Sequence, residues 1–358
     1  MEDVVTDTTT NPLARDLDET LDRNRAMWEE LRGARVFATG ATGFFGAWLL
    51  ETLLWANDRL ELGASIVALT RDPRAFQRRM PHLAHHPAVT LHFGDARTFE
   101  FVGGPFSHVI HAATDSSTTS AQDDRLGLFD TIVAGTRRAL EFAHASGAER
   151  FLLTSSGAVY GRQPSEVTHV PEDYTGAPDP AVPGHAYGEG KRAAEMLCAL
   201  YASRQLRPAI ARCFAFVGPH LPLDQHFAVG NFIRDALDGG PIRIAGDGTP
   251  VRSYLYAADL AVWLWTILLR GQPTRPYNVG SEAALSIAEL AGAVAHTVSG
   301  NIPVMVAKRA SDAPPERYVP STARARHELG LDVTVDLHSA LARTVSWHMG
   351  RTASHVKH

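Results

Sequence analysis

Tyr187 and Lys191 are the residues whose types and spacing most directly predict chemistry. They lie four residues apart in the segment HAYGEGK, residues 185–191, and on a helix this spacing places both side chains on one face. An unperturbed tyrosine ionises near pH ~10, and a neighbouring positive charge favours the phenolate and lowers that pKa. The pair therefore predicts a general acid/base that exchanges protons with a substrate hydroxyl near neutral pH. A surface helix that carries the two residues by chance is the alternative.

A glycine-rich turn near the N-terminus predicts a nucleotide-binding loop. Gly40, Gly43 and Gly46 follow a short apolar strand and open an apolar helix. In such a loop the first glycine permits the tight turn, the second lets a pyrophosphate approach, and the third lets the helix pack on the strand. The helix N-terminus then faces the phosphate charge. Two residues separate the first two glycines, where the usual dinucleotide fingerprint has one, and a turn without a ligand is the alternative. The expected loop contacts are Gly40, Thr42, Gly43, Phe44, Phe45 and Gly46.

The ends of the second and third predicted strands bear on which dinucleotide binds. NAD enzymes usually offer an acid to the ribose hydroxyls at the end of the second strand, but Thr70 is neutral there and Arg71 could pair with a 2′-phosphate. These two residues favour NADP modestly over NAD. Asp72 comes one or two residues late for the acid, so NAD stays open. Asp95, followed by Ala96, could accept a hydrogen bond from the adenine amino group, with a turn residue as the alternative.

The composition is that of an ordinary globular chain. Of its 358 residues, 45% are hydrophobic and 20% are charged, which suits one large α/β domain or one and a half. A net charge of −5 argues against a nucleic-acid partner. Every apolar run is shorter than the ~18 residues of a membrane span, and the N-terminus lacks a signal pattern. Because cysteine occurs only at Cys198 and Cys213, we expect a reducing, cytoplasmic location.

Strands and helices alternate along most of the chain. This order predicts a Rossmann-type doubly wound parallel sheet, covered by helices on both faces. The expected helices include 126–145 and 186–203. The expected strands are 34–39, 65–69, 89–93, 108–112, 151–155, 209–214 and 277–280.

Four segments are expected to organise the chain. Residues 1–33 form an N-terminal extension with an acidic amphipathic helix at 16–32, and residues 34–218 form the dinucleotide-binding domain. Proline and glycine become frequent after Pro219, which predicts a smaller α/β substrate-binding lobe over 219–345, with a tail at 346–358. The packing residues expected in the first helix are Leu17, Leu21, Met27, Trp28 and Leu31.

Taken together, the motifs resemble an extended short-chain dehydrogenase/reductase of the NAD(P)-dependent nucleotide-sugar epimerase/dehydratase family. The resemblance spans residues 34 to 330, and the motifs follow one another in the family's order. They are TGATGFFG at 39–46, HAA at 111–113, SSGAVYG at 155–161, YGEGK at 187–191, FVGP at 216–219, RSYLY at 252–256 and YNVG at 277–280.

The resemblance implies a mechanism and a set of contacts. Tyr187 would be the general acid/base, Lys191 would hold the nicotinamide ribose and lower the tyrosine pKa, and Ser156 would hydrogen-bond the reacting hydroxyl. Hydride would pass between the nicotinamide and a sugar carbon, typically C4. Further expected contacts are His111, Ala112 and Ala113 to the cofactor, and Thr114, Asn231, Arg252 and Arg317 to a nucleotide-diphosphate sugar. Arg252 would pair with the diphosphate, and a solvent-facing arginine is the alternative. A homodimer through helices 126–145 and 186–203 is also implied.

Departures from the family pattern narrow the expected reaction. The family's 4,6-dehydratases place an Asp-Glu pair after the catalytic Ser/Thr, and its decarboxylases use the Glu, but here Gly157 and Ala158 can transfer no proton. A C4 epimerase is therefore the first expectation and an NADPH-dependent 4-ketoreductase the second. Dehydratase or decarboxylase follows, and a non-catalytic NADP-binding protein comes last. Ala215 also replaces an Asn that often contacts the diphosphate. His82, His85 and His86 lie in one polar stretch without a carboxylate or cysteine, so we expect a solvated loop and no metal.

Overall fold

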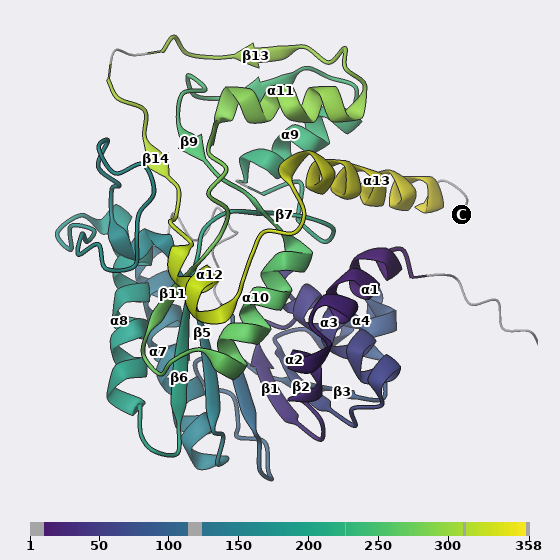
Figure 1. The fold of residues 1–358 in the computed structure, drawn as a ribbon, viewed down its shortest axis with the longest axis vertical. Helices are drawn as coiled ribbons and strands as arrows, with labels where there is room; N and C mark the ends of the chain where they lie inside the picture. The colour runs from purple at the N-terminus through teal and green to yellow at the C-terminus, as the bar shows by residue number, and fades with distance from the viewer. Residues whose placement is uncertain (1–10, 114–123, 226, 311–312, 356–358) are drawn as a thin grey trace, which may run out of the picture.

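A seven-stranded parallel sheet forms the centre of the molecule (Figure 1). The computed structural model describes residues 11–113, 124–225, 227–310 and 313–355, with side chains to residue 350. The sheet order is β11-β6-β5-β4-β1-β2-β3, and each neighbouring pair is parallel. These strands are β1 (Arg35–Thr39), β2 (Ser65–Thr70), β3 (Val89–Phe93), β4 (His108–His111), β5 (Arg150–Ser156), β6 (Arg207–Cys213) and β11 (Pro276–Val279). The predicted fold class is confirmed, and each strand begins and ends within two residues of its predicted bounds.

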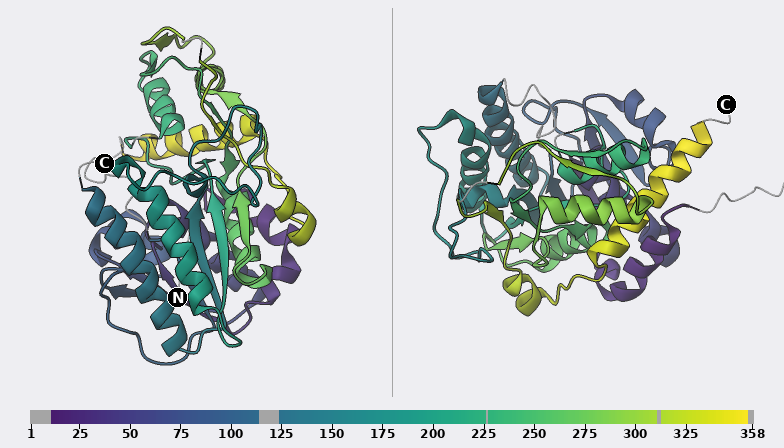
Figure 2. Two further views of the ribbon diagram at one scale, coloured as in Figure 1. Left: turned by 90° about the vertical axis from the view of Figure 1, so that its left-hand side faces the viewer. Right: turned by 90° about the horizontal axis from the view of Figure 1, so that it is seen from above.

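Helices cover both faces of the sheet, as the alternating order predicted. On one face lie α7 (Arg125–Ala145) and α8 (Ala186–Tyr201), which run side by side (Figure 2). On the other face lie α3 (Phe44–Leu60) and α10 (Ala257–Arg270). Strand β1 shows the two-residue alternation directly, because Phe37 joins the core under α7 and α8 while its neighbours join the core under α3 and α10.

The N-terminal extension is docked on the main body. The expected helix at 16–32 is instead two helices, α1 (Ala14–Arg23) and α2 (Arg25–Glu29). They separate at Asn24, whose side-chain amide donates to the carbonyl of Thr20 at 3.0 Å and so competes with the helical backbone. All five predicted packing residues are buried. The buried Asp16 accepts from the Tyr256 hydroxyl at 2.6 Å and from Arg343, which ties the extension to the C-terminal part of the chain.

A smaller lobe follows β6, and its hydrophobic core also takes in Leu13 and Leu17 of the N-terminal extension and Trp48 of α3. Three short strands form one of its sheets, in the order β12-β9-β14, and two further pairs are β10 with β7 and β13 with β8. Its strands are β7 (Phe216–Val217), β8 (Ile242–Ile244), β9 (Val251–Arg252), β10 (Leu255–Tyr256), β12 (Leu285–Ser286), β13 (Val304–Val306) and β14 (Arg317–Tyr318), and its helices are α9 (Ala228–Leu237), α11 (Ile287–Val298) and α13 (Leu337–His355). Within the same stretch of sequence, β11 is a strand of the main sheet and α10 packs on one of its faces.

Short helices connect the larger elements. They are α4 (Pro73–Arg79), α5 (Pro81–Ala84), α12 (Ala323–Leu329) and two 3₁₀ turns, η1 (Gly157–Tyr160) and η2 (Pro183–His185). Cys198 and Cys213 are buried free thiols. Among the described helices, none has the length and apolar character needed to cross a membrane.

Candidate active site

Ser156, Tyr187 and Lys191 are brought together at the carboxyl edge of the main sheet. Ser156 is the last residue of β5, and the other two lie in the first turns of α8. The Lys191 ammonium donates to the carbonyl of Thr154 at 2.8 Å and lies 5.8 Å from the centre of the Tyr187 ring. The Ser156 hydroxyl neighbours the Tyr187 phenol and favours its ionised form. The three predicted groups therefore share one site.

Burial dominates the protonation of this site. It raises the pKa of Tyr187 to about 12, although the hydrogen bond with Ser156 acts in the opposite direction. Burial also lowers the pKa of Lys191 to about 8, because its cation is removed from water. We expected Lys191 to lower the pKa of Tyr187, but the net shift in this structure is upward, and desolvation of the phenol is its largest cause.

The glycine loop has the geometry of a phosphate cradle. Gly40 has a φ of +70°, and a Cβ there would overlap the backbone of Ala112, just as a Cβ at Gly46 would overlap the backbone of Ala41. A Cβ at Gly43 would instead meet its nearest atom at an ordinary 3.5 Å. The fold thus requires the first and third glycines, whereas the second keeps the N-terminus of α3 open. An anion can approach the first-turn N–H groups there, so these residues fit a dinucleotide pyrophosphate.

The HAA segment supports the glycine loop from β4. His111 is buried, and its Nδ1 lies 2.8 Å from the Thr39 hydroxyl. Burial lowers its pKa to about 3, which keeps the imidazole neutral. The same Thr39 hydroxyl accepts from the N–H of Ala113 at 3.2 Å. Thr39 therefore ties the start of the glycine loop to the end of β4, and the Ala112 backbone lies directly against Gly40.

The expected adenosine end of the site carries several charges. Thr70 is buried, Arg71 is exposed, and Asp72 caps α4 by accepting from the N–H of Ala75 at 2.9 Å. Asp95 pairs with Arg97 at 2.8 Å, and Arg97 together with the nearby Arg71 lowers the pKa of the Asp95 carboxyl. The adenine role expected for Asp95 therefore competes with an ion pair.

Arg79 is a loop contact that sequence reasoning missed. It extends from α4 and donates to the carbonyl of Thr42 inside the glycine loop. The signal in the sequence was a helix with several basic residues directly after Thr70.

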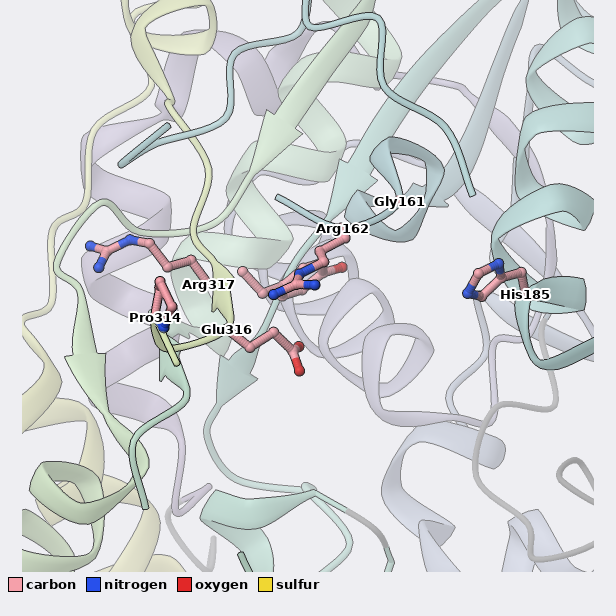
Figure 3. Close-up of a pocket in the computed structure, with 7 residues that line it drawn as sticks. Gly161, Arg162, His185, Pro314, Glu316 and Arg317 are labelled. Atoms are coloured by element: carbon pink, nitrogen blue, oxygen red, sulfur yellow. The ribbon is translucent and has the colours of Figure 1, made fainter. Parts of the chain in front are cut away.

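An open pocket of about 460 Å³ is lined in part by Tyr318, whose hydroxyl lies 3.3 Å from Ser156 Oγ. Arg317 and Tyr318 reach it from β14, and His185 lies across it from Pro314 and Arg317 (Figure 3). The remaining lining residues are Gly161, Arg162 and Glu316. Arg162 directly follows the SSGAVYG motif and was not singled out from the sequence, although that position was the available signal.

The expected substrate-binding residues are placed unequally. Arg252, on β9 beside β14, pairs with Glu316 at 2.7 Å, so it lies next to the pocket that Arg317 lines. Asn231 lies on α9, where its side-chain oxygen accepts from Arg234 at 3.2 Å, and it is not among the residues that line this pocket. Thr114 lies outside the described residues.

The backbone at Gly157 is crowded by two aromatic rings. A Cβ at this position would lie 2.7 Å from the Phe214 ring and 2.8 Å from the Tyr318 hydroxyl. These two rings pack against each other with their centres 4.6 Å apart. Any side chain at residue 157 would therefore require both rings to move.

The three histidines near Pro81 point to different partners. His82 Nε2 lies 2.8 Å from Glu51, His86 Nε2 lies 3.1 Å from Asp58, and His85 Nδ1 lies 3.0 Å from the carbonyl of Pro81. Within the described part of the chain, no group of three or more histidine, cysteine or acidic residues is placed to hold a metal ion.

Comparisons with known proteins give a family match and several similar folds. The pattern that defines the NAD dependent epimerase/dehydratase family matches residues 36–280. The chain is 30% identical to UDP-glucuronic acid decarboxylase 2 of Arabidopsis thaliana over 87% of this chain and 67% of that protein. Its fold resembles MoeE5 in complex with UDP-glucose and NAD, with a TM-score of 0.71, 25% identity and coverage of 89% and 100%. It also resembles UDP-glucose 4-epimerase of Thermotoga maritima, with a TM-score of 0.73, 19% identity and coverage of 89% and 99%.

Proposed function

Because the chain belongs to the NAD dependent epimerase/dehydratase family, we propose that it is a nucleotide-sugar epimerase acting by transient oxidation at C4 of an NDP-hexose. One observation carries the choice of reaction. Ser156 is followed by Gly157 and Ala158, and the space beside Gly157 is filled by Phe214 and Tyr318. Among the described residues, the two positions after Ser156 thus place no acid beside the hydroxyl and the phenol, which suits oxidation and reduction at one carbon without elimination.

The cofactor proposed for this site is NAD or NADP. Its pyrophosphate would lie on the glycine loop at the N-terminus of α3, with Gly43 providing the close approach. Lys191 would hold the nicotinamide ribose, since its ammonium is already directed to the same strand end. When bound, the nicotinamide supplies the acceptor and then the donor of a hydride. The chain itself supplies binding, orientation and proton transfer.

Proton transfer is assigned to Tyr187 and Ser156. Tyr187 takes the proton of the sugar C4 hydroxyl as the carbon is oxidised, and returns it after the 4-keto sugar has turned its other face. Ser156 assists the same step by favouring the ionised phenol, because its hydroxyl acts to lower the pKa of Tyr187. The pKa of about 12 for Tyr187 makes it a strong base once ionised, and a cationic neighbour in the complex would favour that form.

Substrate binding is assigned to the arginines around the pocket. Arg252 would pair with the diphosphate, exchanging its partner Glu316 for phosphate oxygens. Arg317 and Arg162 line the same pocket and provide further positive charge. Ala215 contributes no side-chain amide, so in this chain the diphosphate would depend on the guanidinium groups.

The decarboxylase relatives support a nucleotide-sugar substrate but not the same reaction. The position where decarboxylases carry a Glu is Ala158 in this chain, and a methyl group moves no proton. The 4,6-dehydratase reaction is disfavoured for the same reason, because Gly157 and Ala158 stand where dehydratases carry both members of their acid pair. A non-catalytic dinucleotide-binding protein is the last alternative, because Ser156, Tyr187 and Lys191 are all present and brought together.

A 4-keto-6-deoxysugar reductase that uses NADPH is the second candidate. The observation that favours it is Arg71, an exposed guanidinium at the end of β2 where a 2′-phosphate would lie. Asp72 is the acid that could have favoured NAD, but its carboxylate caps α4 by accepting from the N–H of Ala75. A reductase would use the same serine, tyrosine and lysine in one direction only.

Product mass distinguishes the two candidates. The protein would be incubated with a panel of nucleotide hexoses and 4-keto-6-deoxy sugars, with and without NADPH, and the products separated before mass spectrometry. A product of unchanged mass and new retention time, formed without added cofactor, supports the epimerase. A gain of two hydrogens that requires NADPH supports the reductase.

Tyr187→Phe tests the catalytic assignment. The variant should lose at least about a hundredfold in turnover, because it has no exchangeable proton, while dinucleotide binding persists. Activity equal to that of the wild type would show that Tyr187 is not the acid/base.

We further propose a homodimer through α7 and α8, located in the cytoplasm. Met196 and Leu200 are four residues apart on α8, with 61% and 71% of their surfaces exposed, and Leu126 on α7 is 72% exposed. On α7, by contrast, Ile132, Leu140 and Phe142 are buried in the core beneath the helix. The contact surface would therefore centre on α8.

A further inference from the structure

Tyr318 brings a third hydroxyl group to the catalytic centre from the smaller lobe. Its Oη lies 3.3 Å from Ser156 Oγ and 3.4 Å from the carbonyl oxygen of Cys213. Its ring is held against Phe214, and the residue lines the substrate pocket. The position follows from the parallel pairing of β14 with β9, which sets Tyr318 opposite Arg252.

The hydrogen-bonding capacity of Ser156 limits what its neighbours can do. A serine hydroxyl has one proton to donate and two lone pairs that accept. Ser156 Oγ accepts from the N–H of Ala158 at 3.1 Å and lies 3.3 Å from Tyr318 Oη. It also neighbours the Tyr187 phenol, whose ionised form it favours. The carbonyl of Cys213 can only accept. Tyr318 must therefore donate its single proton either to that carbonyl or to Ser156.

Two arrangements satisfy this count. In the first, Tyr187 donates to Ser156, Ser156 donates to Tyr318, and Tyr318 donates to the carbonyl of Cys213. In the second, Tyr187 is ionised, so Ser156 donates to Tyr187 and Tyr318 donates to Ser156. The Tyr318 hydroxyl thus turns from the carbonyl to the serine when Tyr187 loses its proton.

We propose that Tyr318 is a positioning residue whose hydroxyl donates to Ser156 when Tyr187 is ionised, and so stabilises the base form of Tyr187 through Ser156. A hydrogen bond to a charged form favours that form, and chains of hydrogen bonds strengthen one another in a buried site. Tyr318 keeps its own proton throughout, and the proton that Tyr187 loses or gains is exchanged with the sugar hydroxyl. The inference rests on the proposed function.

The test is the pH dependence of turnover in Tyr318→Phe. Removal of the hydroxyl should move the rising limb of the kcat–pH profile to higher pH by about one unit. At pH values below the limb, this shift lowers kcat by about tenfold. The loss should shrink as the pH rises, while KM for the nucleotide sugar stays within about threefold of the wild-type value. A loss by the same factor at every pH would mean that Tyr318 is merely structural, and an unchanged profile would also overturn the proposal.

A matched control and a double variant sharpen the test. Tyr160→Phe removes a buried hydroxyl that donates to Asn278 at 2.7 Å on a ring that also neighbours Phe214, and its profile should keep the wild-type shape. In a Ser156→Ala background, Tyr318→Phe should cause no further loss, because it acts through the serine. A full additional loss in that background refutes the inference. Wild-type protein that turns over no nucleotide sugar refutes the proposed function, and the inference with it.

Discussion

Replacing Lys191 with Met should reveal what it costs to bury the cation of the candidate active site. Lys191 is 3% exposed, and burial lowers its pKa from 10.5 to about 8. Each pKa unit corresponds to about 1.4 kcal/mol, so the charged form costs about 3 kcal/mol more to bury than the neutral amine. The side chain is retained at that cost because, in the proposed function, it holds the nicotinamide ribose.

The sign of the pH dependence follows from the two pKa values. The pKa of the folded protein lies below that of the unfolded chain, so the unfolded chain binds more protons between about pH 8 and pH 10.5. The penalty is fully present below about pH 8 and disappears as the pH rises through that window. Wild-type stability should therefore rise relative to Lys191→Met by about 2 to 3 kcal/mol between about pH 7 and about pH 10.

Urea unfolding of the ligand-free proteins at these two pH values measures the difference. The Met side chain fills a similar volume without a charge, although it gives up the hydrogen bond to Thr154. That bond affects stability at both pH values, so it cancels in the change with pH. Lys308→Met, which alters an exposed lysine, is the control and should show no such change. If wild type and Lys191→Met differ in stability by the same amount at both pH values, the reasoning about the buried cation is wrong.

Three further predictions concern the dinucleotide and the assembly. Gly43→Ala should weaken dinucleotide binding by about tenfold with little change in melting temperature, because the fold leaves room for its Cβ. Gly46→Ala should instead destabilise the protein by about 1–3 kcal/mol, because its Cβ would overlap the backbone. Calorimetric titration and thermal unfolding check both variants, and equal melting temperatures for the two would contradict the assignment. Arg71→Ala should weaken NADP binding by at least about tenfold more than NAD binding, since a charge-assisted bond contributes about 1.5–3 kcal/mol; equal weakening of the two would remove the argument for NADP. Met196→Lys with Leu200→Lys should give a monomer in light scattering at a concentration where the wild type is a dimer, and a monomeric wild type at micromolar concentration would contradict the dimer.

The sequence predicted those features whose residues lie close together along the chain. The turn from β1 into α3 needs Gly40 and Gly46 for steric reasons that act within a few residues, and this made the loop recognisable. The one-turn spacing of Tyr187 and Lys191 likewise predicted a shared helix face. The alternation of apolar strands with helices led to the parallel sheet, because buried parallel strands leave a strong pattern.

The smaller lobe was much less predictable, because its strands are short and pair over long distances. Residues 242–245 and 251–254 flank a Gly-Asp-Gly turn, yet β8 pairs with β13 and β9 pairs with β12 and β14. Two- and three-residue strands have too few side chains to specify a partner. Their pairing depends on how α9, α11 and α13 pack into a core that also includes Leu17 and Trp48 from the N-terminal part of the chain.

The amino-acid sequence by itself determined the family and the parallel sheet, and it pointed to Tyr187 as the proposed acid/base group, since each depends on residue types at short, fixed spacings. Only the tertiary structure decided what surrounds that group. It raised the pKa of Tyr187 through burial, brought Tyr318 to Ser156 across 162 residues of chain, and joined Asp16 to Tyr256. Desolvation and long-range contacts arise from how distant segments pack, and no local pattern of residues encodes them.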